Sequence, residues 1–197
     1  MQAFRQLEAV AAPLAQANVD TDQIVPALYL QKPRSENFGN YLFHDVRHDA
    51  RGDRRPEFVL NAAVYAEARI LVAGSNFGCG SSREHAVWAL HDGGFRVVIA
   101  PSFGDIFYSN ALKNGLLPVR LPEAWVESML ATLMAAPGTR LRVDLEAQTV
   151  TDPQGRAEPF VIDPFARHCL LAGLDEIDYT LTQHARIEDY ERRHALR

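Results

Sequence analysis

The sequence predicts an α/β fold in which a mixed sheet is flanked by helices, and two short apolar runs carry that prediction. Residues 70–73 (ILVA) and 97–100 (VVIA) are each followed by a Gly or a Pro, as buried strands often are. Between them, Glu84 to His91 has the composition of a helix and is closed by Gly93-Gly94. The order strand, helix, strand indicates an α/β core.

The same alternation continues along the chain. Residues 104–113 suit a second helix, which Asn114-Gly115 stops, and residues 116–119 return to an extended apolar segment. Apolar side chains then recur at helical spacing from Trp125 to Met134. These features predict a further strand and a helix with one face toward the core.

The last third of the chain predicts an antiparallel addition and a helical tail. Residues 140–145 alternate polar and apolar side chains, and the turn at 152–155 leads to a partner strand. Residues from about 163 to 197 are predicted to be mostly helical, with Pro164 at a first helical position. With 197 residues, 47% of them hydrophobic, we expect one domain over residues 1–197.

Composition excludes several classes of protein. The formal net charge of −5 argues against nucleic-acid binding, and no run of about 18 apolar residues predicts a membrane span. The two cysteines, Cys79 and Cys169, lie far apart and do not resemble a secreted disulfide framework. We therefore expect a soluble cytoplasmic protein.

A glycine-rich turn between residues 74 and 85 is the most informative segment. Ser81, with Glu84 three positions later, matches a capping box, so a helix is expected to begin there with its free N–H groups at an anion site. A helix cap without a ligand is about equally compatible with this spacing. Arg83 favours the anion site, because a guanidinium opposes the helix dipole unless it holds an anion such as a carboxylate.

Other nucleotide and hydrolase motifs fit this turn less well. There is no P-loop lysine and no nucleophile elbow around Ser81. Gly78 and Gly80 provide part of a dinucleotide-binding fingerprint, but Arg83 occupies the place of the third glycine. A dinucleotide-binding module therefore remains a secondary interpretation.

Four segments together resemble a known family. They are residues 18–26 (NVDTDQIVP), 76–86 (NFGCGSSREHA), 100–107 (APSFGDIF) and 114–119 (NGLLPV). In this order they resemble the small subunits of isopropylmalate isomerases, in the aconitase superfamily, and the similarity extends from about residue 5 to about 190.

The resemblance implies a swivelling β/β/α domain that closes over a large subunit in a heterodimer. That partner would carry a [4Fe–4S] cluster, with none bound by this chain, whose two cysteines are too few to hold one. The implied reaction interconverts 2-isopropylmalate and 3-isopropylmalate by dehydration and rehydration in leucine biosynthesis.

The resemblance also implies roles for four residues. Ser81 would be the general base that removes and returns a proton beside a substrate carboxylate. Arg83 and Ser82 would bind carboxylate oxygens whose charge grows in the transition state. Asp22 would orient a histidine of the large subunit.

A polar segment at about residues 28–57 corresponds to the part of the family that selects the substrate's side group. Leu28, Tyr29 and Leu30 could supply an apolar wall for an isopropyl group, and Lys32 and Arg34 could contact a carboxylate. Related substrates such as citramalate or homocitrate remain alternatives, as does a non-catalytic regulatory domain that binds a carboxylate.

Overall fold

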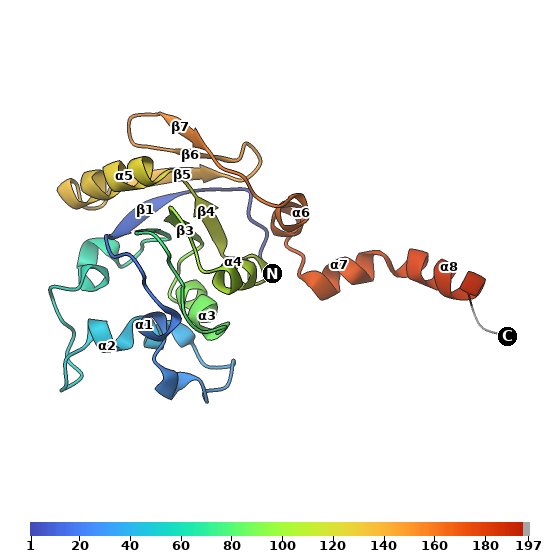
Figure 1. Ribbon diagram of the computed structural model, residues 1–197, viewed down its shortest axis with the longest axis horizontal. Helices are drawn as coiled ribbons and strands as arrows, with labels where there is room; N and C mark the ends of the chain where they lie inside the picture. The colour runs from blue at the N-terminus through green and yellow to red at the C-terminus, as the bar shows by residue number, and fades with distance from the viewer. Residues whose placement is uncertain (195–197) are drawn as a thin grey trace.

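The computed structural model describes residues 1–194, and in this part of the chain seven strands form one sheet in the order β4-β3-β2-β1-β5-β6-β7 (Figure 1). The strands are β1 (Gln6–Leu14), β2 (Ile70–Ala73), β3 (Val97–Ala100), β4 (Leu117–Arg120), β5 (Arg140–Asp144), β6 (Thr149–Thr151) and β7 (Ala157–Pro159). Strands β1 to β4 run parallel, and β5 to β7 add an antiparallel extension. The predicted mixed sheet is confirmed.

Strand β1 joins the two halves of the sheet. Its Ala11 pairs in parallel with Ile70 of β2, and its Leu7 pairs antiparallel with Val143 of β5. This strand was not predicted from the sequence. Three alanines and one proline are among its nine residues, and both residue types are depleted in strands. The local sequence therefore gives β1 a low strand propensity.

Helices cover both faces of the parallel half. Helices α3 (His85–Asp92) and α4 (Asp105–Lys113) lie on one face, and α5 (Glu123–Ala135) and α6 (Pro164–Ala172) lie on the other (Figure 1). Helices α3, α4 and α5 match the predicted helices to within one or two residues, whereas α6 starts where the tail helix was predicted but ends at Ala172. Met134 of α5, predicted to face the core, is exposed, and Val126 is buried.

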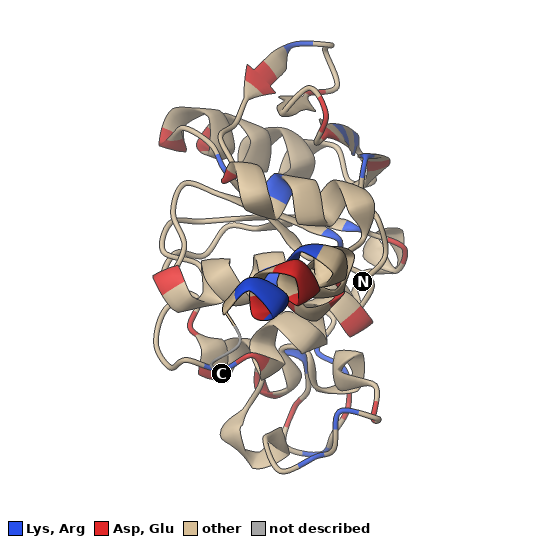
Figure 2. Ribbon diagram, turned by 90° about the vertical axis from the view of Figure 1, so that its right-hand side faces the viewer, with Lys and Arg blue, Asp and Glu red and all other residues tan. Residues whose placement is uncertain are grey.

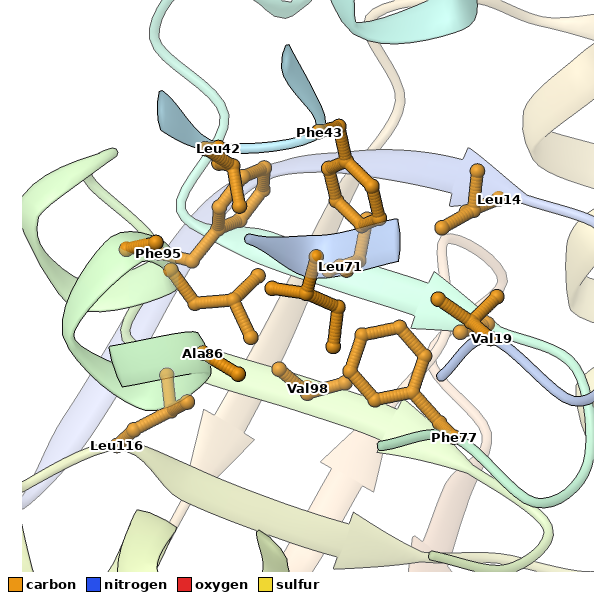
Figure 3. Close-up of a cluster of buried hydrophobic side chains, with 14 of the residues drawn as sticks. Leu14, Val19, Leu42, Phe43, Leu71, Phe77, Ala86, Phe95, Val98 and Leu116 are labelled. Atoms are coloured by element: carbon orange, nitrogen blue, oxygen red, sulfur yellow. The ribbon is translucent and has the colours of Figure 1, made fainter. Parts of the chain in front are cut away.

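Alternate side chains of β1, β2 and β3 enter two separate cores. Leu71 and Val98 point into the first core with Phe77, Ala86 and Leu116, as Figure 3 shows. Their neighbours along the same strands, such as Val72 and Ile99, enter the second core under α5 and α6. Because both faces are buried, these strands are apolar throughout, as the sequence indicated.

The long connection between β1 and β2 consists of short helical turns. It contains α1 (Thr21–Ile24), α2 (His44–Arg47) and 3-10 turns at Ala27–Tyr29, Phe38–Tyr41, Val59–Asn61 and Ala63–Tyr65. Phe38, Leu42 and Phe43 from this connection are buried in the first core. The polar segment is therefore attached to the domain by its few large apolar side chains.

The tail forms an arm that extends away from the sheet (Figure 1). It consists of α7 (Glu176–Thr182) and α8 (His184–His194), on which Ile177, Leu181 and Tyr190 are exposed. The helical tail is confirmed up to residue 194, and residues 195–197 lie outside the described part. At its root, Lys113 pairs with Glu176 at 3.1 Å.

No helix within residues 1–194 combines the length and the apolar character that crossing a bilayer requires. On the face shown in Figure 2, acidic and basic residues are interspersed along the ribbon. Charges of both signs also alternate in the sequence, for example in residues 51–55 (RGDRR), as is typical of a solvated surface.

Candidate active site

The glycine-rich turn leaves the carboxyl end of β2 with left-handed backbone conformations at two glycines. Gly78 has φ +71° and Gly80 has φ +92°. A Cβ atom on Gly78 would also collide with the ring of Phe107 in α4. Glycine is therefore required at position 78 both by its backbone conformation and by the packing of the neighbouring helix.

Hydrogen bonds fasten the segment that follows β1 to this turn, and three of them lie close to Ser81. The Gly78 N–H donates to the Val19 carbonyl at 2.7 Å, and the Thr21 N–H donates to the Cys79 carbonyl at 2.9 Å. The Thr21 hydroxyl donates to the Ser81 carbonyl at 3.1 Å. The backbone of Ser81 is thus held in place while its side chain stays exposed.

The segment after β3 supports the turn from the other side. The Phe77 N–H donates to the Ser102 carbonyl at 3.0 Å, and the Gly104 N–H donates to the Phe77 carbonyl at 2.9 Å. Three loops that follow parallel strands therefore meet at the carboxyl edge of the sheet, where α/β proteins commonly bind ligands.

Four predicted site residues are brought together at this edge. Arg83 forms an ion pair with Asp22 through its Nη1 atom, and Ser81 and Ser82 directly precede Arg83 in the turn. Both serine residues are exposed, whereas the Arg83 side chain is only 20% exposed. A half-buried guanidinium thus lies beside two accessible hydroxyls.

The predicted capping box at Ser81 is wrong. Helix α3 begins at His85 with Glu84 as its N-cap and without a side-chain cap. The Glu84 carboxylate instead accepts a hydrogen bond from Asn114 Nδ2 at 2.7 Å, and the Arg83 N–H donates to the Ser81 carbonyl at 2.8 Å. The tight turn at Arg83 keeps Ser81 out of the helix, and its hydroxyl is therefore left for another role.

A capping box does form on the neighbouring helix α1. The Asp20 side chain accepts from the Gln23 N–H at 2.7 Å, and the Gln23 side chain accepts from the Asp20 N–H at 3.3 Å. The spacing of an Asp and a Gln three residues later could have predicted it. This cap orients α1, which carries Asp22.

The first part of the polar segment, residues 28–41, is called the selection loop, and it lies against α3. The His85 ring lies beside the backbone of Leu30 and contacts the Phe38 ring edge to face, and burial lowers the pKa of His85. Tyr29 stacks on Tyr41 with ring centroids 4.2 Å apart, and Leu28 is 77% exposed. The predicted apolar residues therefore lie next to the segment that carries Ser81.

The two predicted cations of this loop have carboxylate partners of their own. Lys32 pairs with Glu36 at 3.8 Å. Arg34 binds both carboxylate oxygens of Asp92, at 2.8 and 3.0 Å, at the opposite end of α3 from Ser81. The structure thus does not bring Arg34 to Arg83. Asp92 could not be predicted as its partner, because nothing in the local sequence distinguishes this carboxylate from others on the surface.

The described residues contain no set of ligands for an iron–sulfur cluster. Within residues 1–194, no three His, Cys, Asp or Glu side chains come together as a metal site. Cys79 is half-buried in the turn, and Cys169 is buried on α6, where burial raises the pKa of its thiol. Two thiols at separate places do not fit such a cluster.

Comparison with known proteins defines the family. The aconitase C-terminal domain family matches residues 1–124, and the LeuD_N family matches residues 127–164. The 3-isopropylmalate dehydratase small subunit of Rhodospirillum centenum is 52% identical over 193 residues, with 98% of this chain and 95% of the relative covered. The subunit of the same name from Magnetococcus marinus is 50% identical over 203 residues, with the same coverage. The chain belongs to the 3-isopropylmalate dehydratase small-subunit family.

A solved structure supports the same assignment. The 3-isopropylmalate dehydratase of Methanocaldococcus jannaschii superposes with a TM-score of 0.66 at 26% identity, covering 94% of this chain and 99% of that one. Membership of the dehydratase family confirms the aconitase-type fold and the hydro-lyase class that the resemblance implied. It also favours this assignment over the dinucleotide-binding interpretation, and a small subunit implies a large-subunit partner.

Proposed function

We propose that this chain is the small subunit of an enzyme that isomerises 2-isopropylmalate to 3-isopropylmalate by dehydration and rehydration in leucine biosynthesis. The observation that carries the proposal is the meeting of Ser81, Ser82, Arg83 and Asp22 at the carboxyl edge of the sheet. The substrate is inferred from the names of the relatives, which are 3-isopropylmalate dehydratase small subunits.

The large subunit is the partner, and it contributes the [4Fe–4S] cluster that the described residues of this chain do not fit. Residues 1–197 act as one swivelling domain of a cytoplasmic heterodimer. The exposed serines and the exposed Leu28 lie where closure over a partner would enclose a substrate. The four residues of this chain act on the proton and carboxylate side of the reaction.

Ser81 is the general base. As an alkoxide, its oxygen takes the proton from the carbon beside a substrate carboxylate, and the C–H electron pair forms the double bond as the hydroxyl leaves. The hydroxyl departs as water with a proton from the acid of the large subunit, and in rehydration a water adds to the double bond while the Ser81 hydroxyl returns the proton. A serine is a weak base, so the positive field of Arg83 and of the nearby α3 N–H groups stabilises the alkoxide.

Arg83 and Ser82 hold the carboxylate whose negative charge increases as the proton leaves. The ion pair with Asp22 uses Nη1 of Arg83, and a guanidinium has five donors, so it can hold a carboxylate at the same time. Because these donors are fixed before the reaction, they stabilise the transition state with little rearrangement.

Asp22 orients a histidine of the large subunit that acts as an acid. Its Oδ1 atom accepts from Arg83, and its second oxygen can accept from an imidazole N–H. Leu28, Tyr29 and Leu30 form the apolar wall for the isopropyl group, and Lys32 approaches a distal carboxylate when its exposed pair with Glu36 opens.

Reconstitution tests this function directly. The chain is co-expressed with the cysteine-bearing large subunit of the same organism, and the complex is assayed with 3-isopropylmalate, citramalate and homocitrate. We expect activity in the complex, none in the isolated chain, and the highest kcat/KM for 3-isopropylmalate. A preference for citramalate or homocitrate would reject the substrate, and full activity of the chain alone would reject the subunit role.

A further inference from the structure

Asp92, at the last turn of α3, binds the selection loop at two separate points. Its two carboxylate oxygens accept from Nη1 and Nη2 of Arg34, at 2.8 and 3.0 Å. Oδ2 also accepts from the Phe38 N–H at 3.0 Å. The Asp92 side chain is only 15% exposed, so these contacts are partly shielded from solvent.

Aromatic packing reinforces this junction between the selection loop (Arg34 and Phe38) and α3 (Trp88 and Asp92). The Arg34 guanidinium lies over the Trp88 ring, 5.2 Å from its centroid. Phe38 is fully buried and contacts Trp88 and His85 edge to face. A Cβ on Gly39 would lie 2.7 Å from the Gly93 nitrogen, so the loop backbone and the end of α3 are in direct contact.

Helix α3 therefore connects the proposed base to the proposed specificity residues. The turn that holds Ser81 precedes the first residue of α3. The His85 ring, near the start of the helix, lies beside Leu30 and contacts the Phe38 ring, and Asp92 at its end binds Arg34 and Phe38. With both ends of the selection loop fixed to one rigid helix, the distance between Ser81 and the apolar wall is set by α3.

This geometry changes the expectation for Arg34. Both terminal nitrogens of its guanidinium are engaged by Asp92, in the bidentate arrangement that is the strongest a carboxylate offers. An arginine held in this way and stacked on a tryptophan has a structural partner, and it is not presented to a substrate carboxylate.

We propose that Asp92 and Arg34 are positioning residues for substrate selection: together they hold Leu28, Tyr29 and Leu30 at a fixed place relative to Ser81, without touching the substrate. This inference rests on the proposed function, and it names residues that determine specificity through the loop.

The test uses the reconstituted heterodimer with the variants Arg34→Ala, Asp92→Ala, Asp92→Asn and the double variant Arg34→Ala/Asp92→Ala. Arg140→Ala is the matched control. Arg140 lies on β5 and also pairs with a carboxylate, that of Glu8 on β1, but neither residue belongs to the selection loop or to α3. For each complex, kcat and KM are measured with 3-isopropylmalate and with citramalate, which lacks the isopropyl group, together with the melting temperature and the yield of assembled complex.

We expect each single variant to raise KM for 3-isopropylmalate roughly 5- to 20-fold with kcat within about twofold, and the double variant to resemble the singles, because the residues act as one unit. The ratio of kcat/KM between 3-isopropylmalate and citramalate should fall, whereas Arg140→Ala should change nothing. Loss of general stability alone would not alter that ratio.

Two results would overturn the proposal. If Arg34 contacted the substrate itself, Arg34→Ala would raise KM, whereas Asp92→Ala would leave KM unchanged or lower it by releasing the guanidinium. If no variant altered KM or the ratio, the junction would have no part in selection. Should Asp92→Ala not assemble, Asp92→Asn, which keeps an acceptor for Phe38, is judged by the same criteria.

Activity of the wild-type complex distinguishes failure of the proposed function from failure of the positioning role. A wild-type heterodimer that is inactive on 3-isopropylmalate refutes the proposed function, whereas an active wild type with unaltered variants refutes only the role of Asp92 and Arg34.

Discussion

Arg83 and Asp22 form an ion pair between two segments that are 61 residues apart in the sequence. The pair joins the turn after β2 to helix α1, and the hydrogen bonds of Thr21 to Cys79 and Ser81 run alongside it. A cation, an anion and two hydroxyls are thereby placed together before any substrate arrives. Such preorganisation is what electrostatic stabilisation of a transition state requires.

Replacing Asp22 should separate catalysis from stability. Its side chain is 53% exposed, and an exposed ion pair contributes at most about 1 kcal/mol to the free energy of unfolding. Asp22→Asn should therefore leave the urea midpoint nearly unchanged, whereas loss of the orienting charge lowers turnover of the complex by about 10²-fold. Normal turnover in this variant would remove Asp22 from the mechanism.

The two neighbouring serines should respond differently to truncation. Ser81→Ala should lower kcat by about 10³-fold, because it removes the proposed base. Ser82→Ala should lower kcat/KM by about 10- to 100-fold with a smaller loss in kcat than Ser81→Ala, because it removes one hydrogen bond to a carboxylate whose charge grows in the transition state. Both serines are exposed, so folding and complex formation should be retained. Steady-state kinetics of the heterodimer measures kcat and KM of both variants. A near-normal kcat for Ser81→Ala would reject Ser81 as the base.

Gly78→Ala should destabilise the chain much more than Gly52→Ala. Both glycines have positive φ, +71° and +86°, so each substitution introduces backbone strain of about 1 to 3 kcal/mol. At Gly78 the new methyl group also collides with Phe107, whereas at Gly52 nothing lies within 4 Å. Urea unfolding of the isolated chain should show a loss for Gly78→Ala that exceeds that of Gly52→Ala by at least about 2 kcal/mol. Equal losses would mean that the close contact with α4 is not rigid.

Two half-buried histidines should make stability depend on pH. Burial lowers the pKa of His85 and of His91 below the ordinary value of 6.5. Between the lowered pKa and 6.5 the unfolded chain binds more protons than the folded one. This contribution to stability is therefore complete above about pH 6.5 and is lost as the pH falls.

Urea unfolding between pH 7.5 and 5 measures this dependence. His91→Gln should reduce the slope of the unfolding free energy against pH, because the titrating group is gone. His184→Gln is the control, since that side chain is 67% exposed on the arm, and it should leave the slope unchanged. An unaltered slope in His91→Gln would show that His91 is not the titrating group.

Much of the parallel half of the sheet could be predicted because its strands carry a strong local signal. Ile70–Ala73 and Val97–Ala100 are short, wholly apolar and bounded by breakers, and both are buried on two faces. Strand β1 was missed because its stability comes from pairing on both sides, which the alanine-rich sequence Gln6–Leu14 does not reveal. Local propensity is a weak guide where tertiary pairing decides the structure.

The candidate site, too, could be predicted only in part from the sequence. Ser81 and Arg83 were found because glycines and serines crowd one turn, and the positive φ of Gly78 and Gly80 explains the need for glycine there. The Ser81 capping box failed because the S-x-x-E spacing does not determine whether the backbone turns into the helix before or after Arg83. Asp92 could not be found, since its partner Arg34 lies 58 residues away in the sequence.

The C-terminal arm should exchange its amide hydrogens faster than the rest of the isolated chain. Helices α7 and α8 have 7 and 11 residues, and within the described chain neither contains a buried residue. Helices this short are marginal in water without tertiary packing. By contrast, β2 and β3 lie in the interior of the sheet and are buried on both faces, so their amides open only with the whole domain.

Hydrogen exchange with mass spectrometry measures this on the full chain. Peptides from residues 176–194 should be fully exchanged within seconds to minutes, whereas those covering residues 70–73 and 97–100 should stay protected for hours. Peptides from α6 are the internal control, since its Leu170 is fully buried and its carbonyl accepts the Phe4 N–H at 2.8 Å. Protection of the arm equal to that of α6 would show that self-association or a contact with the body stabilises it, and sedimentation at several concentrations would distinguish these two causes.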